Sequence, residues 1–458
     1  MKHYLKINPI NIKLFLISFP FLLLLSLHST TFSYYGAKYE PPDGKIYHGL
    51  GWHKQSQINY MAMFPADRLP LLVQHMIPLP GNRGMTTQKI LDAFNADHLY
   101  PDSQYMEVSA HFSDNVNVLD SLFAHTGDLD SCIDTLAKAL LAHNKPVFLR
   151  IGLEMNGAWN GYTPWTFPKA YRKLVEELRD RGVKNIATVW CYEPDAPADF
   201  ADSTVQGWKW YPGDDVVDWF SLDPFPKEHF DPSLPDSVGG EITKKGKSEL
   251  FLKFAEERGK PVYLNETTAH SVHITPDSLD IDSADGIHDW GYWFAPFPAF
   301  LQTHPDIKAF NYINLDWTPY PQWAHWGDAR IEINSYISKR WVDSLSNEKF
   351  LCAGYKIPDS TGIHINPEQI SSKTTFTKIS IRSFSNTIAI SYSLTATCHV
   401  TLEILTIKGQ AVTLVTNENQ HPGNYSRVIQ KKHLSKGLYF LKAKFNNNQT
   451  CRKVIIYK

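Results

Sequence analysis

The sequence predicts a (β/α)₈ barrel of the α/β class, followed by a small all-β sandwich domain. Apolar runs of strand length alternate with segments whose apolar residues recur at helical spacing over roughly 300 residues. Uninterrupted apolar strands separated by helices are typical of a parallel sheet covered on both faces. Near the C-terminus the pattern changes to alternating apolar and polar residues, which indicates half-buried antiparallel strands.

Eight apolar runs supply the strands of the predicted barrel. Three intervening segments have helical periodicity, at 129–144, 167–182 and 247–259, and the last two end in charged residues followed by Gly, a typical helix stop. The expected strands are 45–52, 69–79, 104–112, 145–154, 185–194, 216–225, 260–268 and 307–317.

The N-terminus has the pattern of a secretory signal peptide over residues 1–31. Lys2, Lys6 and Lys13 precede or flank the uncharged run "LFLISFPFLLLLSL", which is too short for a confident membrane span. The chain is therefore expected to be exported.

The remaining sequence divides into three parts by the periodicity of its apolar residues. Residues 40–352 form the expected catalytic barrel, and residues 353–372 are a polar linker without periodicity. Residues 373–458 form the expected β-sandwich, in which "VTLEILTIKGQAV", "LSKGLYFLKAKF" and "CRKVIIYK" resemble the C-terminal sorting domain of the type IX secretion system. That resemblance implies the secretion machinery as a partner and a secreted or cell-surface protein. The alternative is an accessory sandwich such as a carbohydrate-binding module.

Composition excludes several classes of function. The net charge of −2 and the absence of long basic runs argue against a nucleic-acid partner. The five cysteines are widely spaced, which implies neither a zinc site nor a disulfide framework, although Cys398 and Cys451 could pair. No paired histidine motif, phosphate loop or GxSxG motif is present, so we expect no metal, no cofactor and no serine hydrolase.

Four carboxylates follow the expected strands and are candidates for chemistry. Glu154 ends the fourth strand, Glu193 the fifth, Asp223 the sixth and Glu266 the seventh. Functional side chains of these barrels lie at the carboxyl ends of the strands. Glycoside hydrolysis needs one acid that protonates the leaving oxygen and one carboxylate nearby. Glu154 and Glu266 are the expected catalytic pair. For Glu193 the alternative is a residue that caps a turn, and for Asp223 a residue that holds a loop through backbone hydrogen bonds.

The segments "LRIGLEMNGAWNGY", "WKWYPGDDVVDWFSLDPF", "GKPVYLNET" and "IKAFNYINLDW", in this order, resemble glycoside hydrolase family 26. The resemblance runs from about Gly49 to Trp341 and implies a retaining hydrolase on a (β/α)₈ barrel. It implies Glu154 as the acid/base and Glu266 as the nucleophile, with Trp159 as a subsite tryptophan.

The sequence departs from this family at two positions. The family has His before the acid/base, where this chain has Leu153, and Tyr two residues after the aspartate that ends the sixth strand, where it has Phe225. Losing one hydrogen bond to the nucleophile costs about 1–3 kcal/mol, or about tenfold to a hundredfold in rate. Both departures weaken the case for a mannanase in particular.

Aromatic and amide side chains near the strand ends suit a sugar-binding cleft, because aromatic rings stack on sugar faces and amides bond to hydroxyls. Asn160, Asn314 and Gln322 are further candidates for hydroxyl contacts, and Trp323 and Trp326 for stacking; Trp190, Trp219 and His111 are alternatively core residues. The expected substrate-binding residues are Trp159, Asp223, Asn156, His111, Trp190, Phe225, Trp317 and Trp165.

The sequence therefore predicts a monomeric, secreted, retaining endo-β-glycanase that acts on a hemicellulose polysaccharide. β-Mannan is the first expected substrate, with β-1,3-xylan or mixed-linkage glucan as alternatives. A hydrolase of another barrel family would share the mechanism. The alternative from another class is a non-catalytic glycan-binding surface protein, which Leu153 and Phe225 favour and the two glutamates oppose.

Overall fold

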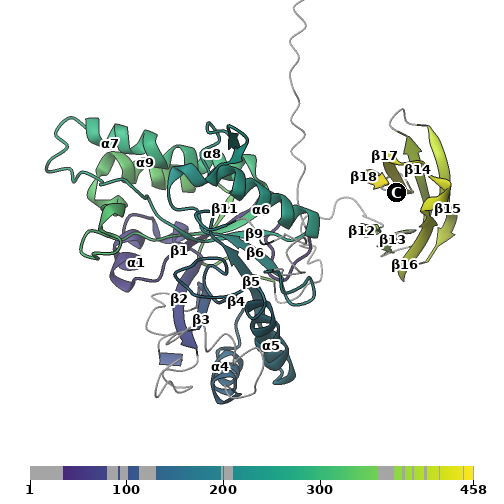
Figure 1. Ribbon diagram of the computed structural model, residues 1–458, viewed down its shortest axis with the longest axis horizontal. Coiled ribbons are helices and arrows are strands. Elements are labelled where there is room, and N and C mark those ends of the chain that lie inside the picture. Colours follow the sequence, from purple (N-terminus) through teal and green to yellow (C-terminus); the bar gives the residue numbers. More distant parts are fainter. Residues whose placement is uncertain are drawn as a thin grey trace, which may run out of the picture. The chain divides into compact units, whose positions relative to one another are not determined.

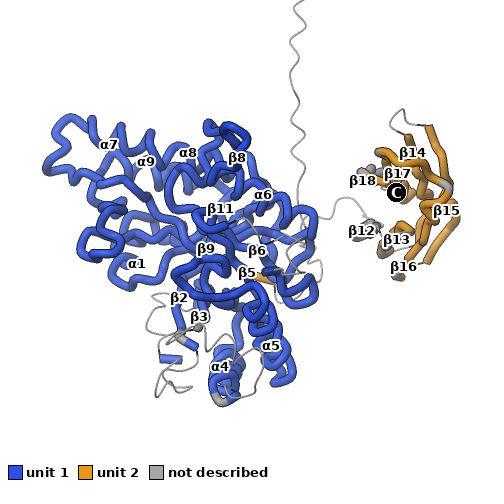
Figure 2. The backbone as a smooth tube through the Cα atoms, viewed as in Figure 1, with its two compact units in different colours: residues 1–356 blue, residues 357–458 orange. Residues whose placement is uncertain are grey.

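The computed structural model divides into two compact units, residues 1–356 and 357–458 (Figure 2). The expected signal peptide and most of the expected linker lie outside the part that the structure describes. The described residues are 35–79, 91–92, 102–112, 130–197, 200, 210–358, 376–383, 387–394, 397–406, 410–421, 423–446 and 448–456.

The first unit is a closed barrel of eight parallel strands, in the order β1-β2-β3-β4-β5-β6-β9-β10, with β10 pairing back onto β1 (Figure 1). A short strand, β11, pairs with the beginning of β1 at Ile46 and Tyr47. All eight strands predicted from the sequence are present, so the predicted barrel is confirmed. The strands are β1 Ile46–Leu50, β2 Leu72–Leu79, β3 Tyr105–Phe112, β4 Val147–Ile151, β5 Ile186–Tyr192, β6 Trp219–Leu222, β9 Val262–Thr267, β10 Ile307–Tyr312 and β11 Phe350–Leu351.

Helices follow most of these strands and surround the barrel, as Figure 1 shows. The three helices predicted from periodicity correspond to α4, α5 and α6. Within the described part of this unit, the α-helices with defined bounds are α1 Lys54–Met61, α4 Asp130–His143, α5 Phe167–Asp180, α6 Lys244–Arg258, α7 Ala284–Asp289, α8 Pro296–Thr303 and α9 Ser335–Leu345. A π-helical turn, Trp290–Phe294, joins α7 to α8, and short 3₁₀ turns lie at Ala66–Arg68, Lys227–His229, Ala324–Trp326 and Ile331–Ile333. A two-stranded ribbon, β7 Ser237–Val238 and β8 Glu241–Ile242, precedes α6.

Local sequence explains why these elements form where they do. Every residue of β4 and β5 is buried, as expected for strands covered by the barrel core on one face and by helices on the other. In α5 the buried residues recur at helical spacing, from Phe167 through Leu174 to Leu178. The predicted stop of α6 is a left-handed Gly259 (φ +64°), a conformation that favours glycine.

The second unit is a β-sandwich with its own core. A three-stranded antiparallel sheet, β12-β13-β16, packs on a four-stranded sheet, β15-β14-β17-β18. Alternate residues of each strand are buried, such as Ile388 and Ile390 on β13 and Val400 and Leu402 on β14, which is the period-two pattern of the sequence. The strands are β12 Phe376–Ser383, β13 Thr387–Leu394, β14 Cys398–Thr406, β15 Ala411–Gln420, β16 Gly423–Gln430, β17 Gly437–Phe445 and β18 Asn448–Ile456, with a 3₁₀ turn at Lys431–His433.

The strand register separates the two cysteines of the sandwich. Cys451 on β18 lies opposite Lys442 of β17, and Lys442 lies opposite Glu403 of β14. Cys398 is five residues further along β14, about 16 Å at the usual rise per residue, whereas a disulfide needs Cα atoms less than about 7 Å apart. The pairing that the sequence left open is therefore wrong. Within the described ranges, no helix combines the length and hydropathy needed to span a bilayer.

Candidate active site

Three of the carboxylates singled out in the sequence meet at the mouth of the barrel. Glu154 lies three residues after β4, Asp223 directly after β6, and Glu266 within β9. One carboxylate oxygen from each lies within 4.8 Å of the others. Closure of the barrel brings the carboxyl ends of its fourth, sixth and seventh strands together, as expected for parallel strands.

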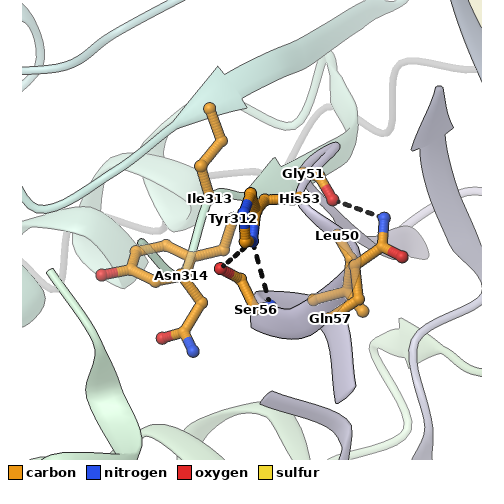
Figure 3. A pocket seen from close by; sticks show the side chains of 8 residues that line it. All are labelled: Leu50, Gly51, His53, Ser56, Gln57, Tyr312, Ile313 and Asn314. Atoms are coloured by element: carbon orange, nitrogen blue, oxygen red, sulfur yellow. Dashed lines mark hydrogen bonds between the residues drawn. The ribbon is translucent and has the colours of Figure 1, made fainter. Parts of the chain in front are cut away.

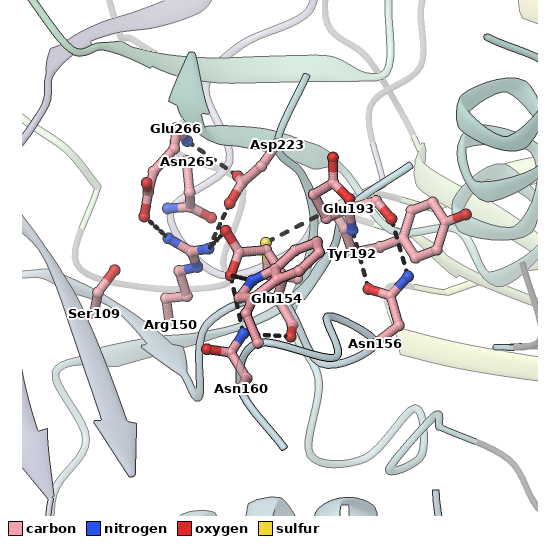
Figure 4. Close-up of polar contacts among 12 residues, drawn as sticks. Ser109, Arg150, Glu154, Asn156, Asn160, Tyr192, Glu193, Asp223, Asn265 and Glu266 are labelled. Atoms are coloured by element: carbon pink, nitrogen blue, oxygen red, sulfur yellow. Dashed lines mark hydrogen bonds and ion pairs between the residues drawn. The ribbon is translucent and has the colours of Figure 1, made fainter. Parts of the chain in front are cut away.

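Arg150 holds these carboxylates together from inside the barrel (Figure 4). This β4 residue is fully buried, and its Nη2 donates to Asp223 Oδ2 at 2.5 Å. Its Nη1 donates to Glu266 Oε1, and its Nη2 lies 3.7 Å from Glu154 Oε1. The backbone N–H of Glu266 also donates to Asp223 Oδ1 at 3.0 Å. Asp223 therefore binds both the arginine and the backbone beside Glu266, so it supports the site instead of facing open space.

Burial and charge oppose one another at this site. Burial raises the pKa of Glu266, the guanidinium of Arg150 acts against that rise, and the nearby charge of Glu154 adds to it. Burial also raises the pKa of Asp223 well above its usual range, again against the effect of Arg150. For Asp223 and Glu266, burial therefore outweighs the opposing effect of the one buried guanidinium, and both pKa values lie above their usual range.

Glu154 is held on its outer side by residues of its own loop. The indole N–H of Trp159 donates to Glu154 Oε2 at 3.2 Å, and the side-chain amide of Asn160 donates to the same oxygen at 3.0 Å. Asn160 is almost buried, whereas Trp159 is 59 % exposed. The Trp159 ring therefore combines a contact to Glu154 with a face open to a ligand.

A buried polar layer lies among Arg150, Glu266 and the strands around them. Gln74 of β2 donates to Ser109 Oγ at 3.4 Å, and Ser109 Oγ donates to Glu107 Oε1 at 2.8 Å, both on β3. Gln74 also donates to the backbone carbonyl of Asn265, the residue before Glu266, at 3.4 Å. Burial raises the pKa of Glu107 to about 8, so its side chain is mostly neutral at pH 7.

Two predicted site residues instead connect loops to each other. The side-chain amide of Asn156 donates to the carbonyl of Glu193 at 2.9 Å and accepts from its backbone N–H at 3.1 Å. Glu193 Oε2 in turn accepts from the backbone N–H groups of Asp195 and Ala196 at 2.7 and 3.2 Å. Asn156 therefore ties the loop after β4 to the end of β5, and Glu193 has the turn-capping role that the sequence left open.

The aromatic residues expected in the cleft differ in how far they are exposed. Trp159 and Trp165, both after β4, are 59 % and 45 % exposed. Phe225 and Trp317 are 7 % and 4 % exposed and pack against Trp326, with ring centroids 4.9 and 5.0 Å apart.

Among the rings packed around Trp317, the exposed one is that of Trp323. Trp317 Nε1 donates to Thr268 Oγ1 at 3.1 Å, and Trp323, which packs against Trp317, is 36 % exposed. A stacking surface on this side is thus offered by Trp323 and not by Trp317.

Trp190 belongs to the core, which corrects its expected place in the cleft. It is fully buried and packs against Tyr211, Phe220 and Phe251, with ring centroids 5.0–5.5 Å apart. The alternate residues of a barrel strand point inward and outward, and Trp190 points toward α6.

His111 is partly buried near the end of β3, where Pro78 of β2 pairs with it.

The side chains lining a hollow between the ends of β1 and β10 bond mostly to the protein itself, and Gln57 Oε1 is the buried lining atom without a partner (Figure 3). Gln57 donates to the Gly51 carbonyl at 2.7 Å, and His53 accepts from the Ser56 backbone N–H at 3.4 Å. Asn314 donates to Glu332 at 2.7 Å and accepts from the Ile331 backbone N–H at 2.8 Å. Asn314 therefore anchors a turn, contrary to its expected contact with a sugar hydroxyl.

Among the described residues, two groups of side chains bring three candidate metal ligands within 4.8 Å of one another. One is the carboxylate site itself, where Arg150 provides the positive charge. The other is Glu193, Asp195 and His229, where Lys244 contacts Asp195 Oδ1 and provides that charge. A cation at either group would compete with a basic side chain already in place, and we assign no metal to either.

Comparison with known proteins assigns a family to the central part of the barrel. Residues 93–274 match the profile of glycosyl hydrolase family 26. The chain contains a glycosyl hydrolase family 26 domain. The matched region includes Glu154, Asp223 and Glu266, together with Arg150.

Residues 384–457 match a secretion system C-terminal sorting domain, so the second predicted family is also present. This domain indicates export by the type IX secretion system to the cell surface or the extracellular space.

Two curated proteins are similar to this chain over its family 26 region. A "Beta-1,3-xylanase" from Alcaligenes sp. and "Beta-1,3-xylanase TXYA" from Vibrio sp. are each 30 % identical over 244 residues, or 49 % of this chain. The alignment spans about half the length of these relatives, 48 % and 49 % respectively. Among solved structures, a family 26 β-mannanase from Bacteroides ovatus is 16 % identical, with a TM-score of 0.44 over 68 % of this chain and 91 % of that one.

Sequence reasoning missed Arg150, Gln74 and Glu107, although each gives a signal. Each is a polar or charged residue within a mainly apolar strand, in "VFLRI", "LVQHMIPL" and "YMEVSAHF" respectively. A charged or polar residue buried in a strand must find partners inside the protein, and in a barrel those partners come from neighbouring strands.

Proposed function

We propose that this protein is a retaining endo-β-glycanase with Glu154 as acid/base and Glu266 as nucleophile. The observation that carries this proposal is the approach of their carboxylate oxygens to within 4.8 Å. Retaining glycosidases have their two carboxyl groups about 5 Å apart, whereas inverting enzymes need about 6.5–9.5 Å to admit a water molecule.

In the first step, a Glu266 oxygen forms a bond to the anomeric carbon while the bond to the leaving oxygen breaks. The proton of Glu154 passes to that oxygen, and a covalent glycosyl-enzyme results. Arg150 supports this step by donating to Glu266, which favours the ionised form that attacks. Asp223 supports it by holding both Arg150 and the Glu266 backbone.

In the second step, water attacks the anomeric carbon and its proton passes to Glu154. The bond to Glu266 breaks, and the sugar leaves with its original anomeric configuration. Endo action is supported by exposed rings on loops from different strands, Trp159 after β4 and Trp323 after β10, since a chain bound between them would extend past both carboxylates.

For the substrate we propose β-1,3-xylan first and β-mannan second, which reverses the order expected from the sequence. The reversal is supported by the two curated relatives, which are both named β-1,3-xylanases. Leu153 and Phe225, where the sequence departs from the mannanase-like pattern, also argue against β-mannan as the first substrate. Phe225 presents no hydroxyl to Glu266, and Arg150 donates to Glu266 instead.

The second candidate is a non-catalytic glycan-binding protein of the cell surface. Leu153 and Phe225 favour it, together with the sorting domain. It requires that the carboxylates serve no chemistry, which leaves the charge cluster around Arg150 without a function.

The test is release of reducing sugar from β-1,3-xylan, β-1,4-mannan and mixed-linkage β-glucan by the exported protein. Glu154→Gln and Glu266→Gln keep side-chain shape and remove the ionisable group. Glu176→Gln on the outer surface of α5, where the side chain is 53 % exposed, is the matched control. We expect release from one glycan, loss in both site variants and full activity in the control.

Proton NMR of the first products then gives the anomeric configuration, for which we expect retention. Release with inversion would reject the two-step mechanism, and binding without release from any glycan would favour the second candidate. Activity that survives in Glu266→Gln would mean that another group is the nucleophile.

A further inference from the structure

Asn160 makes contacts that the proposed two-step mechanism does not use. Its side-chain nitrogen lies 3.0 Å from Glu154 Oε2 and 2.8 Å from the backbone carbonyl oxygen of the same residue. Both partners are hydrogen-bond acceptors, so only the NH₂ end of the amide can face them. The two N–H groups of one amide therefore clamp the carboxyl group of Glu154 to its own backbone.

The clamp has a fixed position. Asn160 is only 9 % exposed, and its backbone N–H donates to the Gly157 carbonyl at 3.0 Å in the turn after Glu154. Gly157 N–H donates to the Glu154 carbonyl at 3.2 Å, so the same carbonyl closes the turn and accepts from Asn160. The carboxyl group of Glu154 is thus oriented by a short, closed loop of hydrogen bonds.

The two oxygens of Glu154 differ in their surroundings, as Figure 4 shows. Oε2 accepts from Asn160 and from the Trp159 indole N–H at 3.2 Å. Oε1 faces Arg150 Nη2 at 3.7 Å, which is longer than a normal hydrogen bond. An oxygen that accepts two N–H donors has no room to carry a proton toward a substrate, whereas Oε1 faces the same Arg150 nitrogen that donates to Asp223.

We propose that Asn160 is a positioning residue that orients Glu154 so that Oε1 carries the proton delivered to the leaving oxygen. This inference rests on the proposed function, because it requires Glu154 to be the acid. Asn160 does not touch the reacting atoms; it acts through Glu154. Losing the clamp leaves the carboxyl group free to rotate, and the proton is then delivered from a less favourable position.

The dependence of rate on the leaving group distinguishes this role from a structural one. An aryl β-1,3-xylobioside with 2,4-dinitrophenol as leaving group needs no acid for the first step, whereas the phenyl glycoside does. The constant kcat/KM reports the steps up to formation of the glycosyl-enzyme. A defect in acid positioning therefore lowers kcat/KM for the phenyl glycoside and spares the dinitrophenyl glycoside.

The variants are Asn160→Asp, which keeps the shape and removes the donors, and Asn160→Ala, with Glu154→Ala as reference. We expect each Asn160 variant to lose about tenfold to a hundredfold in kcat/KM on the phenyl glycoside and less than about threefold on the dinitrophenyl glycoside. Glu154→Ala should show the same selectivity, with a larger loss. Circular dichroism melting identifies any variant that does not fold, and the other Asn160 variant then decides.

Equal losses on both glycosides in a folded Asn160 variant, beside selective losses in Glu154→Ala, would overturn the inference and leave the proposed function intact. Unchanged kcat/KM on the phenyl glycoside would overturn it in the same way. A wild type that hydrolyses neither glycoside nor any polysaccharide, or a Glu154→Ala variant without leaving-group selectivity, would overturn the proposed function and this inference together.

Discussion

Replacing Arg150 tests how the candidate site is held together. Arg150→Met removes the only buried cation that contacts Asp223 and Glu266 among the described residues, and leaves two buried carboxylates without a cationic partner. Removing one partner of a buried ion pair costs about 3–5 kcal/mol of folding stability. The expected result at pH 7 is therefore a loss of this size in the free energy of unfolding, measured by urea denaturation of the exported protein.

The same change has a defined effect on the pH profile. Arg150 lowers the pKa of Glu266, so its removal raises that pKa, and Glu266 attacks only when it is ionised. A hydrogen bond to a charged group is worth about 1.5–3 kcal/mol, and one pKa unit corresponds to about 1.4 kcal/mol. The acidic limb of kcat/KM should therefore move to higher pH by about one to two units.

The assay is the pH dependence of kcat/KM on the glycan that wild type cleaves. Arg150→Lys keeps the charge but loses the forked donor, so it should shift the acidic limb less than Arg150→Met does. It should also fold if Arg150→Met does not. The matched control is Arg172→Met on α5, whose ion pairs with Asp215 and Glu176 are surface contacts worth less than about 1 kcal/mol. An acidic limb that stays in place in both Arg150 variants would refute the reasoning.

Three further predictions concern single side chains. Glu107→Gln should be about as stable as wild type near pH 3.5, below both pKa values, and more stable than wild type at pH 9 in urea denaturation. The reason is that the pKa of Glu107, about 8 in the folded protein, exceeds about 4.3 in an unfolded chain, so wild type loses stability as the pH rises between them. Trp159→Ala should raise KM about tenfold without lowering the melting temperature, since the ring is 59 % exposed; an equal KM would exclude stacking. Trp190→Ala should cost about 3–5 kcal/mol in urea denaturation, as for a buried aromatic residue, and a change in KM alone would contradict its place in the core.

Most of the barrel was predictable because its elements depend on local patterns. Each run that reads as a buried strand, such as "KPVFLRIGLE", forms one, since a continuous apolar segment is stable only when both faces are covered. The helix ends at Gly182 and Gly259 were equally local, because both adopt positive φ (+82° and +64°). The place of Glu154 and Glu266 at the mouth follows from these elements and the parallel topology.

The roles of individual side chains were less predictable. Asn156 and Asn160 stand four residues apart in one loop, yet Asn156 binds the backbone of Glu193 and Asn160 binds Glu154. Loop composition suggested sugar contacts for both. Which acceptor each amide contacts depends on where the end of β5 lies, and the sequence of the loop does not determine that position.

The sequence by itself determined the order of strands and helices, the sandwich that follows, and the four strand ends that carry carboxylates. Those features depend on periodicity and on residue preferences within short segments. Only the tertiary structure decided that Arg150 meets Asp223 and Glu266, and that Trp190 packs in the core while Trp159 remains exposed. The physical reason is that these contacts join strands far apart in the chain, and the closure and tilt of the barrel set which side chains face one another.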